Sequence, residues 1–184
     1  MKNLSYVKKM VFSAMCITLC IVMPMMFHMI PNIGSVISPM HIPVLLCGLI
    51  CGWPFGLLCG LAGPLLSYYV TGMPMPPFLQ SIMVELAVYG IVTGLLTRLV
   101  RTKSRYADLY ICLIPAMLIG RIIAGVVRAL IISPGEFTFA MWVSGYFISA
   151  LPGIVIHLVL IPVVMLALES AKLIPARYPM QHGH

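Results

Sequence analysis

The sequence predicts an all-α integral membrane protein with six transmembrane helices, and three observations support this prediction. Of the 184 residues, 61% are hydrophobic and only 8% are charged, whereas an average soluble domain carries roughly 25% charged residues. Several apolar segments reach the roughly 20 residues that a helix needs to cross a bilayer core of about 30 Å. The basic residues gather in alternate loops. Lipid is therefore the expected solvent of this chain.

Four apolar segments are long enough to span a membrane, at residues 11–30, 78–96, 109–132 and 140–168. Between the first two lies an uncharged stretch, 39–70, which is too long for one helix and is interrupted at Gly52-Trp53-Pro54. Dividing it there predicts spans at about 9–30, 40–52, 54–71, 78–99, 109–132 and 140–170. No linker separates them, so we expect residues 1–184 to form a single transmembrane domain. The second span is short, and we expect it to be tilted and partly buried or to have flanks that dip into the membrane.

The positions of Lys and Arg predict that both termini lie in the cytosol. Nine of the eleven basic residues precede the first span, lie between the fourth and fifth, or follow the sixth. The loops at 31–38, 72–77 and 133–139 contain none. Because positive residues remain cytosolic, an even number of spans puts both ends inside. The net charge of +7 is thus a topology signal, and we expect no nucleic-acid partner.

Two further patterns concern helix packing. All six cysteines fall within predicted spans, which favours packing as small apolar side chains over disulfide bonding: Cys16, Cys20, Cys47, Cys51, Cys59 and Cys112. The segment from Gly48 to Gly52 is echoed from Gly56 to Gly60. Glycines four residues apart let helices approach closely, so we expect the second and third spans to pack together as a hairpin.

Four ionisable side chains inside the later spans are candidates for function: Glu85, Arg121, Arg128 and His157. A charge at the bilayer centre costs at least about 2.5–3.5 kcal/mol, so it is retained for a reason. With a rise of about 1.5 Å per residue, Glu85 and Arg128 both fall in the outer half. They are expected either to pair with each other or to bind a polar ligand that enters from outside.

Helical spacing brings polar and aromatic residues together on one face of each of the last three spans. The three faces are Ser81, Glu85 and Tyr89; Arg121, Gly125 and Arg128; and Trp142, Tyr146, Ser149, Gly153 and His157. Aromatic walls with a few polar groups are typical of ligand sites. The pattern therefore predicts a cavity that opens outward, although each of these residues also has an ordinary structural role available to it.

The first span carries a pair of small residues, Ala14 and Thr18, four positions apart. Such pairs mediate close helix–helix contact. The contact is either with other helices of this chain or with a separate membrane subunit.

Two segments resemble the substrate-binding S components of energy-coupling-factor (ECF) vitamin transporters. The stretch SPMHIPVLLCGLICGWPFGL, from Ser38 to Leu57, is similar to the family's second-to-third-helix signature. The stretch IPAMLIGRIIAG, from Ile114 to Gly125, is similar to its fifth helix. The resemblance extends over essentially the whole chain. The family's docking motif is usually Ala-xxx-Ala; here Ala14 matches, and Thr18 replaces the second alanine.

The resemblance implies a subunit of a prokaryotic plasma membrane that captures a water-soluble vitamin or related micronutrient from outside at high affinity. It implies docking on a transmembrane coupling subunit that works with two ATPases. This chain has no Gly-x-x-x-x-Gly-Lys-Ser/Thr motif, so we expect no enzymatic activity and no cofactor in it. The implied ligand site lies in the outer half, and the residues expected there are Glu85, Arg128, Tyr89, Tyr146 and Ser149, followed by His41 and Gln80.

The main alternative is a membrane protein that binds or transports copper or another metal ion. The chain has 15 methionines, several of them within residues 23–29, and two cysteine pairs at helical spacing, Cys16/Cys20 and Cys47/Cys51. Thioether and thiolate ligands suit Cu(I). An intramembrane enzyme is less favoured, because neither Gly-x-Ser-x-Gly nor His-Glu-x-x-His occurs. The substrate stays open: Arg128 suits a carboxylate or phosphate, and Glu85 an amine, a hydroxyl or a ring nitrogen.

Overall fold

The predicted all-helical class is confirmed by a computed structural model, which describes residues 4–27, 38–102 and 104–175. Every regular element in these residues is a helix. The helices are α1 (Tyr6–Phe27), α3 (His41–Cys51), α4 (Trp53–Thr71), α5 (Pro76–Leu99), α6 (Arg105–Val127), η1 (Arg128–Ile132), α7 (Phe139–Val143), η2 (Ser144–Ile148) and α8 (Leu151–Ser170). Five continuous helical stretches are long and apolar enough to cross a membrane, and α3 is a shorter apolar helix. The chain is thus a multi-pass membrane protein.

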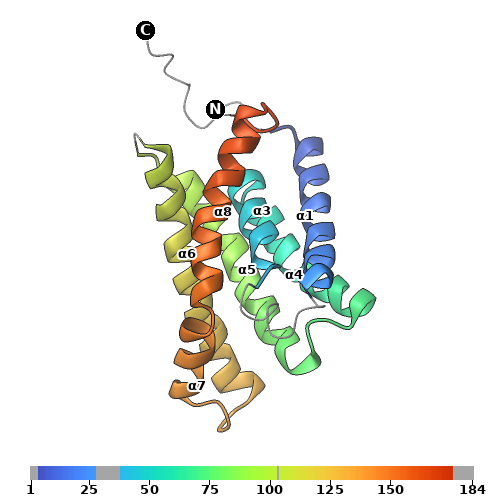
Figure 1. The fold of residues 1–184 in the computed structure, drawn as a ribbon, viewed down its shortest axis with the longest axis vertical. Coiled ribbons are helices and arrows are strands. Elements are labelled where there is room, and N and C mark those ends of the chain that lie inside the picture. The colour runs from blue at the N-terminus through green and yellow to red at the C-terminus, as the bar shows by residue number, and fades with distance from the viewer. Residues whose placement is uncertain (1–3, 28–37, 103, 176–184) are drawn as a thin grey trace.

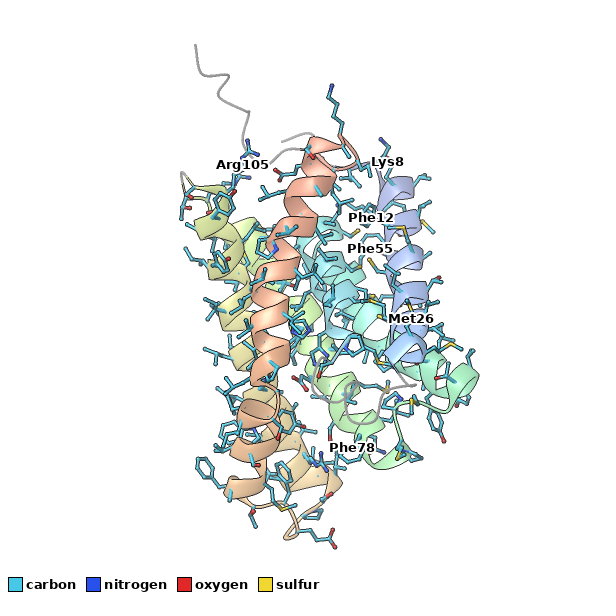
Figure 2. The ribbon with its side chains drawn as sticks, viewed as in Figure 1. Lys8, Phe12, Met26, Phe55, Phe78 and Arg105 are labelled. Carbon is cyan, nitrogen blue, oxygen red and sulfur yellow. The ribbon has the colours of Figure 1, made fainter. Side chains whose placement is uncertain are left out.

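Most of the basic residues that the structure describes lie at one end of the bundle, the exceptions being Arg121 and Arg128. In Figure 1 the start of α1, the turn between α3 and α4, the α5–α6 connection and the end of α8 all lie at the top. Figure 2 places Lys8 and Arg105 at this end and Phe78 toward the opposite one. We call the first the basic end and the second the distal end. The helices cross between them in alternating directions, as the loop charges predict for six spans.

The short helix α3 forms the centre of the bundle. Ten of its eleven residues are buried, from His41 to Cys51 with Ile50 excepted. It begins with the polar His41 and continues in apolar residues on all faces, which is the composition of a fully buried helix. Surrounding helices therefore shield α3 from lipid, which explains why its length is below that of a full span.

The second and third spans, α3 and α4, pack on each other as predicted, but the glycines of the echo face a different helix, α5. A Cβ at Gly48 would meet Thr93, one at Gly56 would meet the backbone of Gly90, and one at Gly60 would meet the backbone of Leu86. The repeated glycines thus bring α3 and α4 against the same helix. Close backbone approach is the function expected of such spacing, but the sequence does not show which helix is the partner.

Gly90→Ala is expected to destabilise the bundle by about 1–3 kcal/mol or more, because the new methyl group would overlap the Gly56 backbone, which has no freedom to move aside. The measurement is the thermal melting of the detergent-purified variant. Gly145→Ala is the matched control, since no atom lies within 4 Å of a Cβ there. Equal melting of both variants would contradict the close α4–α5 contact.

All six cysteines are free and buried, as predicted. Several bond to oxygens of neighbouring groups: the Cys51 thiol donates to the Lys9 carbonyl at 3.6 Å, and the Cys20 thiol to the Met40 carbonyl at 3.7 Å. Five of them are small core residues of α1, α3 and α4, and Cys112 lies on α6 beside Thr97 of α5.

The last two spans are each modified by a π-helix. The Ser133 amide donates to the Arg128 carbonyl and the Ser149 amide to the Ser144 carbonyl, both at 2.8 Å and five residues apart. Segments of π-helix are rare and often occur at functional sites. Here they contain Arg128 and Tyr146, two of the residues predicted to bind ligand.

Candidate functional site

A buried polar cluster joins α3, α5 and α6 around the carboxylate of Glu85. The Tyr89 hydroxyl donates to Glu85 Oε1 at 2.7 Å. His41 Nε2 lies 3.4 Å and Arg121 Nε 3.5 Å from the same oxygen. All four side chains are buried, with Glu85 only 6% exposed. One carboxylate thus ties three helices together.

Histidine from a fourth helix completes this cluster. His157 of α8 stacks on His41 with ring centroids 5.6 Å apart and an interplanar angle of 16°. Tyr89 meets His41 edge-on at 5.3 Å. His41 Nδ1 lies 3.1 Å from the Ser38 carbonyl oxygen. Both nitrogens of the His41 ring therefore face an oxygen atom.

The charge of Glu85 is compensated inside the protein. Arg121 supplies a full positive charge, and the Tyr89 hydroxyl adds a hydrogen bond to the charged group. Removing one partner of a buried pair costs roughly 3–5 kcal/mol, because the other charge is left uncompensated. We call Glu85, Tyr89, Arg121, His41 and His157 the buried cluster.

A second group of residues lies toward the distal end, around Arg128. Its guanidinium carbon is 5.1 Å from the centroid of the Phe78 ring and 4.9 Å from that of Phe137. Phe137 in turn contacts Tyr146 edge-on at 6.4 Å. Among the described residues, neither Arg128 Nε nor the oxygen of Ser81 has a hydrogen-bond partner, and both atoms are buried. We call Arg128, Phe78, Phe137, Tyr146 and Ser81 the distal group.

The residues predicted to bind ligand separate into three sets. Glu85, Tyr89 and His41 meet in the buried cluster, and Arg128 and Tyr146 meet in the distal group. Gln80 and Ser149 form the third set: both are exposed.

The sequence did not predict two contacts, that of Arg121 with Glu85 and that of Trp142 with α6. Glu85 pairs with Arg121, so of the two alternatives expected for Glu85 and Arg128, pairing with each other is not the one found. Trp142 lies over Gly125, where a Cβ would meet its ring, and its Nε1 donates to the Arg121 carbonyl at 3.1 Å. The spacing of Arg121, Gly125 and Arg128 on one face was the available signal. This spacing shows that the three residues share one face of α6, but it does not show which of their side chains reaches α5.

The exposed face of α1 includes both members of the small-residue pair. Ala14 and Thr18 are exposed, and the Thr18 hydroxyl donates to the Ala14 carbonyl at 3.0 Å within the helix. Large apolar side chains surround them on the same face, including Met15 and Val22 at 47% and 42% exposure. The pair therefore lies on the outer surface of α1 and does not mediate packing among the helices that the structure describes.

Metal binding receives no geometric support from the described residues, in which no three His, Cys, Asp or Glu side chains are placed to hold a metal ion. The methionine-rich segment at 23–29 extends past Phe27, and its last residues lie outside the described ranges.

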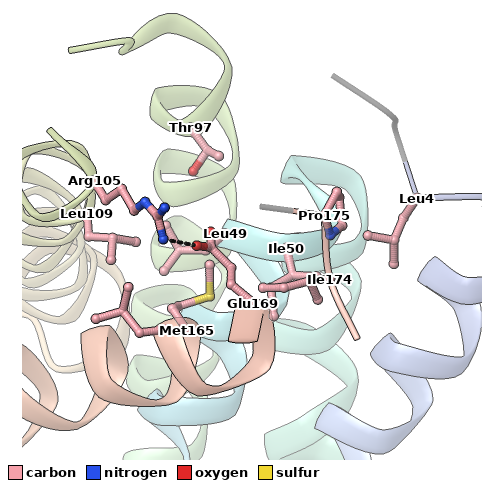
Figure 3. A pocket seen from close by; sticks show the side chains of 11 residues that line it. Leu4, Leu49, Ile50, Thr97, Arg105, Leu109, Met165, Glu169, Ile174 and Pro175 are labelled. Carbon is pink, nitrogen blue, oxygen red and sulfur yellow. Dashed lines mark hydrogen bonds and ion pairs between the residues drawn. The ribbon is translucent and has the colours of Figure 1, made fainter. Parts of the chain in front are cut away.

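A separate cavity of about 70 Å³ lies at the basic end (Figure 3). Its walls are mostly apolar, and Arg105 and Glu169 pair across one side with 3.4 Å between Nη1 and Oε2. Pockets that hold vitamin-sized ligands measure about 300–1,000 Å³. This cavity is therefore too small to be the substrate site.

The chain belongs to the family of substrate-specific components of ECF transporters, whose family model matches residues 8–165. No curated protein and no solved structure matches it. Members of this family bind a small-molecule substrate and associate with ECF membrane and ATPase subunits. The chain is thus a substrate-binding transporter subunit.

Proposed function

We propose that this protein captures a water-soluble vitamin or related micronutrient from outside the cell at high affinity and delivers it to an ECF module. The module comprises a transmembrane coupling subunit and two ATPases. In this proposal the basic end faces the cytosol of a prokaryotic cell, the distal end faces outward, and both termini lie inside. The positive-inside rule supports this orientation.

The observation that supports the substrate site most is the distal group. It lies at the end opposite the basic residues and combines aromatic rings with polar atoms that have no partner within the described chain. Ligand sites have this composition: apolar and aromatic walls with a few polar groups that fix orientation. The buried cluster lies between the distal group and the basic end and holds the helices around it together. Tyr146 belongs to the site in this proposal, and the exposed Gln80 and Ser149 stay candidates at its rim.

Energy for release comes from the partner subunits in this proposal, which treats the chain itself as a binding protein without a cofactor. The exposed pair Ala14 and Thr18 is the proposed contact with the coupling subunit. Small residues permit the close helix approach that such a contact needs.

The proposal is tested by uptake of radiolabelled vitamins into proteoliposomes that contain this chain alone or with an ECF module. The chain alone is expected to bind one vitamin without accumulating it. Accumulation is expected only when the module is present and ATP is supplied on the side of the membrane that carries the ATPase subunits. Accumulation by the chain alone, or failure of every vitamin to bind, would argue against this function.

A further inference from the structure

We infer that the substrate is an anion, with a carboxylate or phosphate group attached to a largely apolar or aromatic body, and that Arg128 binds this group. The inference rests on the proposed capture function and specifies the substrate class of that site. Arg128 and the other residues of the distal group carry it.

Charge compensation is the first argument. The chain has four acidic residues. Glu85 is paired with Arg121 and His41, and Glu169 with Arg105 at the basic end. Asp108 accepts two hydrogen bonds from Thr102 at the same end, each of 2.6 Å.

The remaining acid is Glu136, whose side chain is exposed in the loop between η1 and α7. It makes no ion pair with Arg128 in the described structure. Arg128 is therefore a positive charge in the membrane-spanning region without an acidic partner among the described residues. Such a charge is costly in this environment, and an anionic ligand would supply the countercharge.

Hydrogen-bonding capacity is the second argument. The two phenyl rings that flank Arg128 attract its charge but cannot accept the directional N–H bonds that a guanidinium forms with an oxyanion. The Tyr146 hydroxyl lies beside both the Arg128 guanidinium and the Ser81 hydroxyl. Even so, the buried Nε of Arg128 and the hydroxyl of Ser81, which is 2% exposed, make no well-formed hydrogen bond in the described chain. A buried donor without a partner is unfavourable. A carboxylate or phosphate offers two or more acceptor oxygens and would satisfy both groups.

A cationic substrate fits this arrangement poorly. It would have to lie beside the unneutralised Arg128, and its natural partner, Glu85, is already held by a hydroxyl and two basic side chains. Repulsion against the wrong charge is a common source of selectivity. The aromatic rings of Phe78 and Phe137 suit the apolar body of the ligand.

The test is thermal-shift and equilibrium binding with probes that differ in charge: nicotinate and nicotinamide, biotin and biotinamide, pantothenate and panthenol, with thiamine as the cation. We expect an acid to bind and its neutral partner to bind at least tenfold more weakly. Arg128→Gln should weaken binding of that acid by about 10- to 100-fold, the effect typical of losing a charge-assisted hydrogen bond. Arg128→Lys should retain part of the affinity, because it keeps the charge but not the planar fork.

Arg101→Gln is the matched control, because it removes one exposed positive charge at the basic end and should leave affinity unchanged. Ser81→Ala provides a second variant in case Arg128→Gln does not fold, and we expect it to weaken binding of the acid several-fold. A neutral or cationic vitamin that binds tightly, with equal affinity for wild type and Arg128→Gln, would overturn the anion inference and leave the capture function intact. Folded wild-type protein that binds no probe of any charge would count against both.

Discussion

Arg121→Gln is expected to reduce the stability of the protein by about 3–5 kcal/mol, the usual cost of breaking a buried ion pair. The substitution leaves the carboxylate of Glu85 in a buried site with one fewer positive neighbour; its Oε1 lies 3.5 Å from Arg121 Nε in the native structure. Thermal melting in detergent, followed by tryptophan fluorescence and size-exclusion chromatography, measures the effect.

The double variant Glu85→Gln/Arg121→Gln tests whether the two residues act together. Removing both charges is expected to restore much of the lost stability, because no charge is then left unpaired. Arg105→Gln is the control: it breaks an Arg–Glu pair of similar length, but its side chain is 26% exposed, so the cost should be at most about 1 kcal/mol. Strictly additive losses in the double variant would contradict an ionic core built on this pair.

Ala14→Leu is expected to abolish uptake while leaving substrate binding within about twofold of wild type. Ala14 is exposed on α1, a helix that contributes no residue to either polar group, and the added side chain would hold a partner helix away. Uptake into proteoliposomes with the ECF module measures transport, and equilibrium binding to the isolated chain measures capture.

Val155→Leu is the matched control for this variant, because it enlarges a lipid-facing side chain of α8 that is 58% exposed. It should affect neither binding nor uptake. If the Ala14→Leu variant still takes up substrate at the wild-type rate, the exposed face of α1 is not the docking surface. If Ala14→Leu loses binding as well, its effect is on the fold and not on docking.

The sequence predicted the helical class and the membrane location because both follow from composition and segment length. It also predicted burial of the cysteines, since six thiols within apolar spans have few alternatives. The position of α3 was less predictable. Its length and apolar residues indicated partial burial, but only the assembled bundle shows that α3 is its centre.

The partners of the ionisable residues could be identified only from the three-dimensional structure. Counting residues along a span gives depth, and this suggested that Glu85 and Arg128 meet. Rotation and tilt of the helices decide which side chains touch, and they bring Arg121 and His41 to Glu85 instead. The π-helix that begins at Arg128 changes the local helical period, which no regular 3.6-residue spacing anticipates.

The glycines illustrate the same limit. Their spacing predicted that α3 and α4 pack together, and they do, but the glycines themselves approach α5. A periodic pattern identifies the face of a helix that packs closely. It contains no information on which of several apolar helices lies opposite.

Native mass spectrometry of protein purified gently from detergent, without added ligand, tests the capture function most directly. We expect a stoichiometric organic adduct of a few hundred daltons, whose fragmentation identifies a water-soluble micronutrient with a carboxylate or phosphate group. The adduct should be lost in Arg128→Gln and retained in Arg101→Gln. A stoichiometric copper-sized adduct in place of an organic ligand would contradict the account.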